Sequence, residues 1–201
     1  MNHYSVSGKL TLQEEADSIA DLYGFLALSM RYPEQSFLTP AYLDTMEALL
    51  DSLDWQDEKT ALEQWRTMES DLLISLQVEY TRLFINAVPH VIAPPYGSVY
   101  LDGDASIQGK STEKTRNFYR EQGYDLADDS EPADHIRYEL EFLAHLSRDN
   151  NFAAEEEFLK TLFRPWFRPF HDLVLEKARH PFYRVSVQLI DFLTKEEQEW
   201  Q

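Results

Sequence analysis

Residues 131–143, EPADHIRYELEFL, place a proline and an Asp-His pair immediately before an amphipathic run. Apolar residues recur in that run at helical spacing, which predicts a helix with one buried face. Asp134 suits the start of this helix, because a carboxylate there accepts otherwise free backbone N–H groups. His135 points in another direction, so capping alone leaves the histidine without a role. The apolar stripe consists of Ile136, Leu140, Leu143 and Leu146.

The same spacing recurs on both sides of this stretch, whereas strand signals are nearly absent. The chain has 201 residues, enough to bury one substantial core. We therefore expect an all-α fold, with a single helical-bundle domain covering residues 1–201. The further helical stripes run over residues 12–30, 42–53, 58–85, 112–122, 152–163, 166–174 and 182–193.

Prolines, glycines and short polar residues mark the expected helix ends. A Ser-Asp pair inside the stretch 58–85 predicts a division into two helices. The expected boundary residues are Pro33, Thr39 with Pro40, Ser70 with Asp71, Ser111 with Thr112, Gly123 and Pro165.

Residues 86–110, NAVPHVIAPPYGSVYLDGDASIQGK, break the helical pattern. Prolines and glycines recur throughout this segment, so we expect no helix in it and only a short extended piece at 99–101. A segment of this length without regular structure is uncommon inside a compact domain and tends to be functional. The sequence therefore predicts a long functional loop.

Composition narrows the classes of partner. The formal net charge is −18, which disfavours nucleic acid because phosphate binding requires clustered Lys and Arg. An acidic surface attracts cationic partners instead. The absence of cysteine excludes disulfides, thiolate catalysis and Cys-ligated zinc.

The remaining global signals concern location and local charge. No signal peptide and no apolar run long enough to span a membrane are visible, so we expect a cytoplasmic protein. Residues 160–184 are basic within an otherwise acidic chain. This inversion indicates either a solvated face or a patch that pairs with the acidic loop before Asp134.

A metal site is a weak alternative for the Asp-His stretch. His135 with Glu139, and Glu141 with His145, are each spaced to share a helix face. The HExxH pattern is absent, and such spacing is routine on acidic helices. We therefore expect no metal and no catalytic residue here.

A nucleotide site is the second alternative. The stretch GDASIQGKST, residues 103–112, resembles a phosphate-binding loop but has five residues rather than four between its glycines. The parallel strand that should precede such a loop is also missing. Gly109, Lys110 and Ser111 remain open as a weak anion site at a helix start. A nucleophile elbow is absent as well.

Tyr80, Leu83 and Phe84 close a predicted helix and lead into the long loop. They are either core residues or the apolar wall of a groove beside that loop. A groove with an apolar floor and an acidic rim would suit an apolar peptide that carries basic residues.

Seven short motifs together resemble the TorD/DmsD family of redox-enzyme maturation chaperones. They occur in family order and at family-like spacing between residues 12 and 193, and they are most similar to the DmsD branch. The motifs are YTRLF (80–84), PPYGSVYLD (94–102), GKST (109–112), REQGY (120–124), EPADH (131–135), LFRPW (162–166) and EKARHPFYR (176–184).

The resemblance implies a cytoplasmic chaperone rather than an enzyme. Its partner would be the twin-arginine leader and precursor of a molybdopterin oxidoreductase catalytic subunit, of the dimethyl sulfoxide reductase type. Binding would hold back export until the client's molybdenum cofactor is loaded, so the chaperone needs no cofactor of its own. The implied leader-binding residues are Tyr80, Leu83, Phe84, Pro94, Pro95, Ser98, Gly109, Asp134 and His135.

The resemblance carries further implications. They comprise weak guanine-nucleotide binding, a transient contact with the twin-arginine translocase, and a state that is either a monomer or a domain-swapped dimer. Close relatives usually have Trp at the position of Tyr80 and often Gly near Asn86. The smaller ring at Tyr80 keeps an aromatic platform but reduces its area, which bears on leader preference.

The physical chemistry of such a leader agrees with these residues. Two adjacent guanidinium groups precede an apolar stretch, and carboxylates bind guanidinium groups in bidentate geometry. Asp134, Glu131 and the neighbouring Asp128 and Asp129 would supply the carboxylates. Tyr80 would supply a surface on which an arginine stacks.

Overall fold

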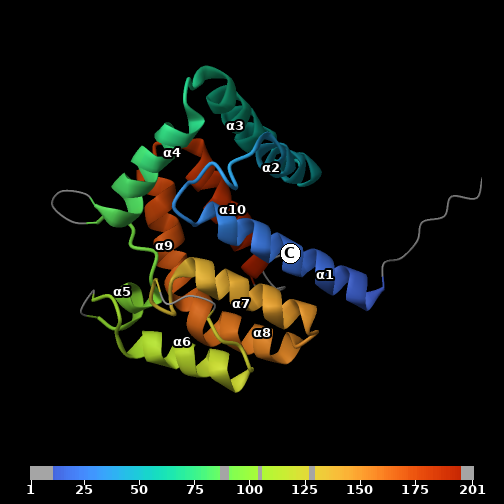
Figure 1. Cartoon of the computed structure of the whole chain (residues 1–201), viewed down its shortest axis with the longest axis vertical. Coiled ribbons are helices and arrows are strands. Elements are labelled where there is room, and N and C mark those ends of the chain that lie inside the picture. The colour runs from blue at the N-terminus through green and yellow to red at the C-terminus, as the bar shows by residue number, and fades with distance from the viewer. Residues whose placement is uncertain (1–10, 87–90, 104–105, 127–129, 196–201) are drawn as a thin grey trace, which may run out of the picture.

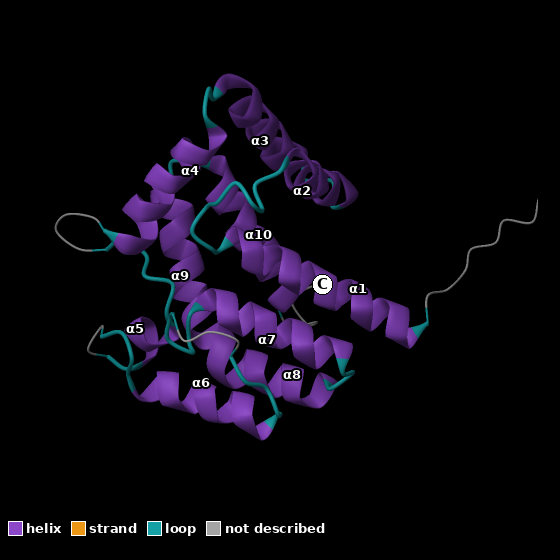
Figure 2. Ribbon diagram, in the orientation of Figure 1, coloured by secondary structure: helices purple, strands orange, loops and turns teal. Residues whose placement is uncertain are grey.

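The computed structural model describes residues 11–86, 91–103, 106–126 and 130–195. Helices dominate these residues, and no strand occurs among them (Figure 2). The extended pairing that is described is an isolated antiparallel bridge between Tyr96 and His135. The prediction of an all-α fold is therefore confirmed.

Ten α-helices and two π-helical turns follow one another along the described ranges. They are α1 (Leu12–Ser29), α2 (Pro40–Ser52), α3 (Gln56–Met68), α4 (Leu72–Tyr80), η1 (Thr81–Ile85), α5 (Gly97–Leu101), α6 (Lys110–Glu121), α7 (Ile136–Arg148), α8 (Phe152–Phe158), η2 (Leu159–Phe163), α9 (Arg164–Lys177) and α10 (Pro181–Thr194).

The helices α1 and α7 lie side by side through the middle of the molecule and form its most extensive helix pair (Figure 1). The helix α10 packs on α1, α3 and α9. In Figure 1, α2 and α3 form the upper end, and α5, α6 and α8 lie at the lower end. The described residues at 91–96 lead into α5 at this lower end.

Large aromatic side chains fill the core between these helices. Phe142 of α7 lies 4.4 Å from the Tyr119 ring of α6 and 4.9 Å from the Phe158 ring of α8, measured between ring centroids. Trp166 and Phe170 of α9 are also fully buried, with centroids 5.6 Å apart. Each such side chain contributes on the order of 2 kcal/mol through apolar burial, so this cluster holds α6–α9 together.

Several predicted boundaries are confirmed by their capping bonds. The side chain of Thr39 accepts a hydrogen bond from Tyr42 N, and Pro40 occupies the first turn of α2. Asp71 caps α4 and separates it from α3, as the Ser-Asp pair predicted. Gly123 follows α6 with φ of +73°, a conformation that favours glycine.

Three expectations were wrong. The segment 86–110 contains a helix, α5, because Gly97 lets its backbone press against the α9 indole; a Cβ there would lie 3.1 Å from Trp166 Cδ1. The helix α6 begins at Lys110 with Gly109 as its cap, not at the predicted Ser-Thr pair. Pro165 does not end a helix: η2 continues into α9, whose first turn tolerates proline.

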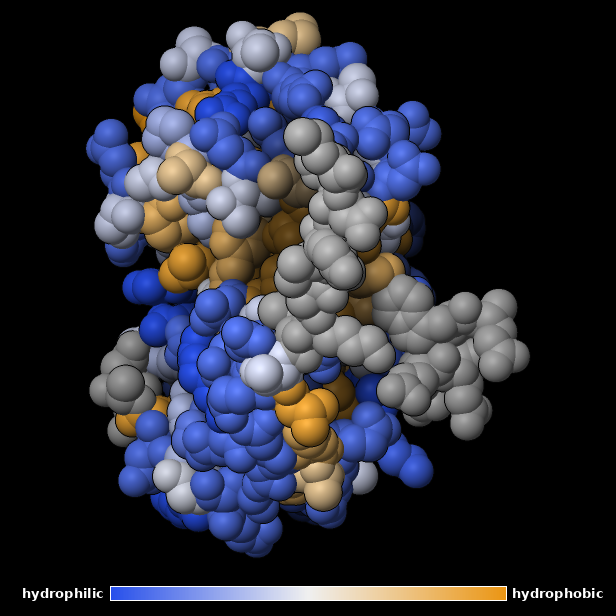
Figure 3. All heavy atoms as spheres, turned by 90° about the vertical axis from the view of Figure 1, so that its right-hand side faces the viewer, coloured by the Kyte–Doolittle hydropathy of each residue, from blue (hydrophilic) through white to orange (hydrophobic). Residues whose placement is uncertain are grey.

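Polar and apolar residues are unevenly distributed over the surface. On the face drawn in Figure 3, hydrophilic residues cover most of both ends, and apolar residues gather between the ends and in a smaller patch on the lower end. Among the described residues, none of the helices is both long enough and apolar enough to cross a membrane.

Candidate functional site

The start of α7 and the segment before α5 are joined by backbone hydrogen bonds. Gly97 N donates to Asp134 O at 3.0 Å, and Ile136 N donates to Pro95 O at 3.0 Å. These bonds flank the bridge between Tyr96 and His135. We call this contact the loop–helix junction; it fixes the two prolines and Tyr96 relative to α7.

The carboxylate of Asp134 strengthens the junction from inside. Its Oδ2 accepts a hydrogen bond from Ser98 N at 2.6 Å, which caps the first turn of α5. The side chain is 1% exposed, and its Oδ1 has no hydrogen-bond partner among the described residues. Asp134 therefore positions the loop, and its carboxylate is out of reach of a guanidinium docked at the surface.

His135, rather than Asp134, caps α7. Its Nδ1 accepts a hydrogen bond from Arg137 N at 3.1 Å. Burial, and secondarily the positive charge of Arg137, lowers the pKa of His135 to about 3. The ring is therefore neutral at physiological pH, with its proton on Nε2 because Nδ1 is an acceptor.

Beside the junction lies a depression of about 190 Å³, which we call the polar chamber. Tyr80 and His135 both line it, so the two ends of the predicted site share one depression. Two carboxylates also reach it from different parts of the chain. The full lining is Arg31, Tyr32, Glu34, Tyr80, Phe84, Ile85, Pro95, Tyr96, Ser130, Glu131, His135 and Arg137.

A larger depression of about 720 Å³ adjoins the polar chamber, and we call it the apolar chamber. Apolar side chains from the loop, η1 and α9 form most of its wall. It is lined by Phe84, Ile85, Val91, Ile92, Pro94, Tyr96, Val99, Tyr100, Ile107, Glu131 and Leu173. The two chambers together are the groove.

Tyr96 and Glu131 stand at the boundary between the chambers, since both residues line both. Tyr96 Oη donates a hydrogen bond to Glu131 Oε2 at 2.7 Å. Burial and this carboxylate raise the pKa of Tyr96 well above its usual value, so the phenol stays protonated and remains a donor.

The turn η1 supplies the third wall of the groove. The π-helical turn shifts the register at the end of α4, where Asn86 N donates to Thr81 O at 2.8 Å. Phe84 and Ile85 of this turn line both chambers. Ala93 N donates to Leu83 O at 2.8 Å, which holds the described residues at 91–96 against this turn.

The nine predicted site residues thus divide into two groups. Five of them line the groove: Tyr80, Phe84, Pro94, Pro95 and His135. The other four stand behind it or beside it: Leu83, Ser98, Gly109 and Asp134.

The members of the second group have structural positions. Leu83 and Ser98 are fully buried. Gly109 lies against Asp102, and a Cβ at Gly109 would be 2.8 Å from Asp102 Cγ. Asp128 and Asp129, which sequence reasoning also offered as carboxylates, lie outside the described residues.

Sequence reasoning missed several groove residues. Tyr96 stands inside the quoted motif at 94–102 but was not singled out, although an aromatic between two prolines and a glycine was a usable signal. Glu34 and Leu173 come from distant segments. Only the tertiary fold brings them to the groove, and no local pattern could have identified them.

The start of α6 already holds an internal anion. The carboxylate of Asp102 accepts hydrogen bonds from Ser111 N at 3.1 Å and from Ser111 Oγ at 2.9 Å. Asp102 therefore occupies the position that a phosphate would take at this helix start. The geometry disfavours the nucleotide site that Gly109, Lys110 and Ser111 left open.

The residues considered as metal ligands are engaged elsewhere. Glu139 Oε2 accepts from Trp166 Nε1 at 2.9 Å. Glu141 pairs with Arg137 at 2.8 Å, and His145 lies 3.5 Å from Asp149. Across the described ranges, no group of three or more possible ligands gathers around one point.

Comparisons with known proteins show the family of this chain. The family model of the nitrate reductase delta subunit matches residues 50–172. The Tat proofreading chaperone DmsD of Salmonella typhimurium is 35% identical over 117 residues, which cover 57% of this chain and 56% of that protein. The chain thus spans little more than half the length of the DmsD relatives that it matches.

Two further likenesses extend over nearly the whole chain. The chaperone protein TorD of Vibrio vulnificus is 24% identical over 201 residues, which cover 92% of this chain and 85% of TorD. The crystal structure of a proposed redox enzyme maturation protein from Archaeoglobus fulgidus aligns with a TM-score of 0.59 and 28% identity. It covers 96% of this chain and 100% of that one.

These findings confirm the resemblance that the seven motifs indicated, and the named relatives are chaperones rather than enzymes. Since the family model matches more than half of the chain, this protein belongs to the nitrate reductase delta subunit family, the family of the TorD and DmsD chaperones.

Proposed function

We propose that this protein is a cytoplasmic chaperone that binds the twin-arginine leader of a molybdopterin-containing oxidoreductase precursor. The client is of the dimethyl sulfoxide reductase type, and the chaperone holds its leader until the cofactor is loaded. The observation that carries the proposal is the groove, because a polar chamber with carboxylates adjoins a larger apolar chamber.

The two chambers match the two parts of such a leader. The arginines would bind in the polar chamber, where Glu34 and Glu131 offer carboxylates. Two arginines also line this chamber, but Arg137 is already paired with Glu141 at 2.8 Å. The apolar stretch that follows would lie in the apolar chamber, against Ile92, Val99 and Leu173 among others.

The aromatic wall favours the same ligand. Tyr80 and Tyr32 meet edge to face at a centroid distance of 5.5 Å, and Tyr32 is 44% exposed. Tyr80 is itself only 6% exposed, and its hydroxyl donates to Met30 O at 3.2 Å. Tyr32 is therefore the better platform for a stacked guanidinium, and Tyr80 holds that platform in place.

Titration calorimetry with a synthetic twin-arginine leader peptide tests the proposal. The control peptide has both arginines replaced by glutamine. It should bind at least about tenfold more weakly, which corresponds to a loss of about 1.4 kcal/mol of binding free energy. In the protein, Glu131→Gln should weaken the native peptide in the same way. Equal affinity for both peptides would contradict the proposal.

A further inference from the structure

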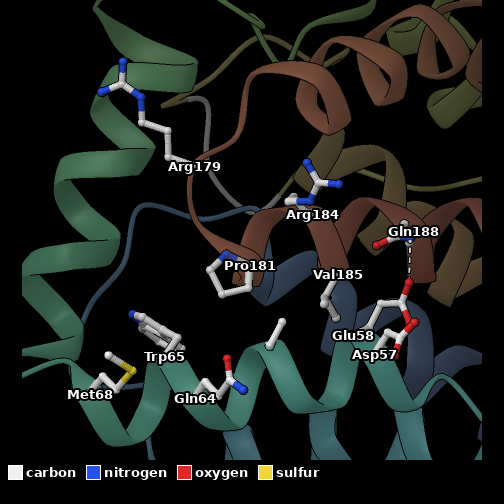
Figure 4. Close-up of a pocket in the computed structure, with 11 residues that line it drawn as sticks. Asp57, Glu58, Gln64, Trp65, Met68, Arg179, Pro181, Arg184, Val185 and Gln188 are labelled. Carbon is white, nitrogen blue, oxygen red and sulfur yellow. Dashed lines mark hydrogen bonds between the residues drawn. The ribbon is translucent and has the colours of Figure 1, made fainter.

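A third depression, of about 500 Å³, lies between α3 and α10, away from the groove (Figure 4). It shares no lining residue with either chamber. Its walls come from the length of α3, the first half of α10 and the short segment before α10. We call it the α3–α10 pocket.

The floor of this pocket is apolar. Figure 4 shows Trp65 and Met68 on α3 facing Pro181 and Val185 on α10. Met68 is 83% exposed, which is unusual for a large apolar side chain next to a concave surface. The indole N–H of Trp65 is used internally, since Nε1 donates to Ser75 Oγ at 3.3 Å. Trp65 therefore offers the pocket only apolar ring surface.

The rim of the pocket carries two arginines. Arg179 and Arg184 belong to the basic segment that stood out in the sequence, and both are exposed. The guanidinium of Arg184 donates to Leu175 O at 2.6 Å, a backbone carbonyl at the end of α9. Neither guanidinium group has a carboxylate partner among the residues that the structure describes, although the backbone N–H of Arg179 donates to Glu79 Oε1 at 2.7 Å.

This lack of pairing is notable in a protein with 36 acidic residues. Arg66, Arg82, Arg137, Arg148 and Arg164 each hold a carboxylate at 2.6–3.0 Å. The two arginines above the pocket are thus available to a negative ligand.

The far end of the pocket is acidic. Asp57 and Glu58 stand there, and Gln188 Nε2 donates to Glu58 Oε1 at 3.4 Å (Figure 4). A ligand that is negative throughout would be repelled at this end, so small polyanions fit poorly. A peptide segment fits better if its acidic residues lie on one side of a large apolar side chain.

We infer that the α3–α10 pocket is a second peptide-binding site, which takes an acidic segment of a partner protein through one large apolar side chain. The apolar side chain lies between Trp65, Met68 and Pro181, and the carboxylates pair with Arg179 and Arg184. The site is independent of the leader groove and selects the opposite charge.

An NMR titration of the full chain tests this inference, because the indole N–H signal of Trp65 reports on the pocket floor even for weak ligands. The probe is a blocked hexapeptide, Glu-Glu-Phe-Gly-Ser-Gly. The control peptide has the same sequence with lysine in place of each glutamate. We expect a saturable shift of the Trp65 signal with the acidic peptide and at least about fivefold weaker binding of the basic one.

Two variants probe the two halves of the site. Arg179→Gln removes the guanidinium but keeps the hydrogen bond that the backbone N–H of residue 179 donates to Glu79. The fold should therefore persist while the affinity for the acidic peptide falls about fivefold. Met68→Ser removes the exposed apolar contact and should weaken both peptides. Arg148→Gln is the matched control, since it makes the same charge change at a salt bridge with Asp21.

The inference fails if the basic peptide shifts the Trp65 signal as strongly as the acidic one, or if neither titration saturates. It also fails if Arg148→Gln weakens binding as much as Arg179→Gln, or if inorganic phosphate alone reproduces the shifts. A twin-arginine leader peptide should leave the Trp65 signal unchanged while shifting Ile92 and Val99. The proposal for this pocket and the proposal for the leader groove can therefore be contradicted independently of each other.

Discussion

At the scale of single residues, Asp134 and His135 have structural roles. Asp134 holds the backbone of α5, and His135 caps α7, so each side chain uses its polar atoms inside the protein. Their effect on a ligand would be indirect, through the position of Tyr96 and the two prolines.

Asp134→Ala should therefore reduce both stability and leader affinity. The substitution leaves Ser98 N without its acceptor, which costs about 1–3 kcal/mol of unfolding free energy. Leader affinity should fall by a similar amount because the loop–helix junction loosens. Denaturant unfolding and calorimetry measure the two effects.

Hydrogen exchange distinguishes this explanation from direct ligand contact. In Asp134→Ala, the amides of Gly97 and Ser98 should exchange faster without any peptide present. Asp134→Asn keeps an acceptor for Ser98 N and should lie between the native protein and the alanine variant. Unchanged exchange in the alanine variant would show that the junction does not depend on this carboxylate.

Glu139 of α7 is 1% exposed and lies close enough to Asp134 for the two carboxyl groups to interact. Burial, and secondarily the charge of Asp134, raises the pKa of Glu139 well above its usual value, although the Trp166 hydrogen bond opposes the shift. The folded state thus retains a proton that the unfolded chain releases near pH 4.5. The stability that this proton supplies is complete below that pH and declines as the pH rises through the folded pKa.

Glu139→Gln should consequently stabilise the protein more at high pH than at low pH. Glutamine can still accept the Trp166 hydrogen bond through its carbonyl oxygen and carries no charge to desolvate. We expect the gain in unfolding free energy at about pH 8 to exceed that at about pH 5 by at least about 1 kcal/mol. Glu157→Gln, on an exposed position of α8, should show no such difference.

At the scale of the elements, helical periodicity predicted most of the fold. The stripes on α1, α2, α7 and α10 are long, and their caps are local, so these helices were visible in the sequence. The helix α5 was not, because its formation depends on Trp166 and Asp134, which lie far away in the chain.

The groove could be predicted only in part for the same reason. Tyr80, Phe84 and the prolines flank the long loop and were expected near it. The burial of Asp134 depends on the packing of distant segments such as α5 against it, and a local sequence pattern carries no information on that packing. The π-helical turns η1 and η2 likewise have no signature in apolar spacing.

The start of α6 allows a test at this scale. Gly109→Ala would push against Asp102 and displace the carboxylate that caps Ser111 N. We expect a loss of about 1–2 kcal/mol of unfolding free energy, the usual scale for a lost helix cap.

A double-mutant cycle separates steric conflict from any other role of the glycine. If Asp102 is first changed to alanine, Gly109→Ala should cost much less, because most of the opposing side chain is gone. Additive losses would mean that Gly109 matters for a reason other than its contact with Asp102.

At the scale of the whole molecule, the net charge of −18 should act on a basic leader before contact. The association rate constant should fall by about tenfold or more between low and physiological ionic strength, whereas the dissociation rate constant should change little. Stopped-flow fluorescence measures both rate constants.

The acidic peptide proposed for the α3–α10 pocket offers the natural contrast. The net negative charge of the protein repels this peptide at long range. Because salt screens that repulsion, added salt should raise the association rate constant of the acidic peptide rather than lower it. Opposite salt dependences for the two peptides would show that the net charge of the protein acts on both encounters. A rate constant for the leader that is independent of salt would contradict the steering expected here.

The hydrogen bond between Tyr96 and Glu131 would have to break before Glu131 could bind another donor in the groove. A neutral phenol donates to this carboxylate, so a bound segment would have to offer a stronger donor to displace it. A guanidinium group meets that requirement, whereas a purely apolar segment does not. Under the proposed function, Tyr96 would therefore favour segments with a well-placed positive charge over unfolded chains that lack one.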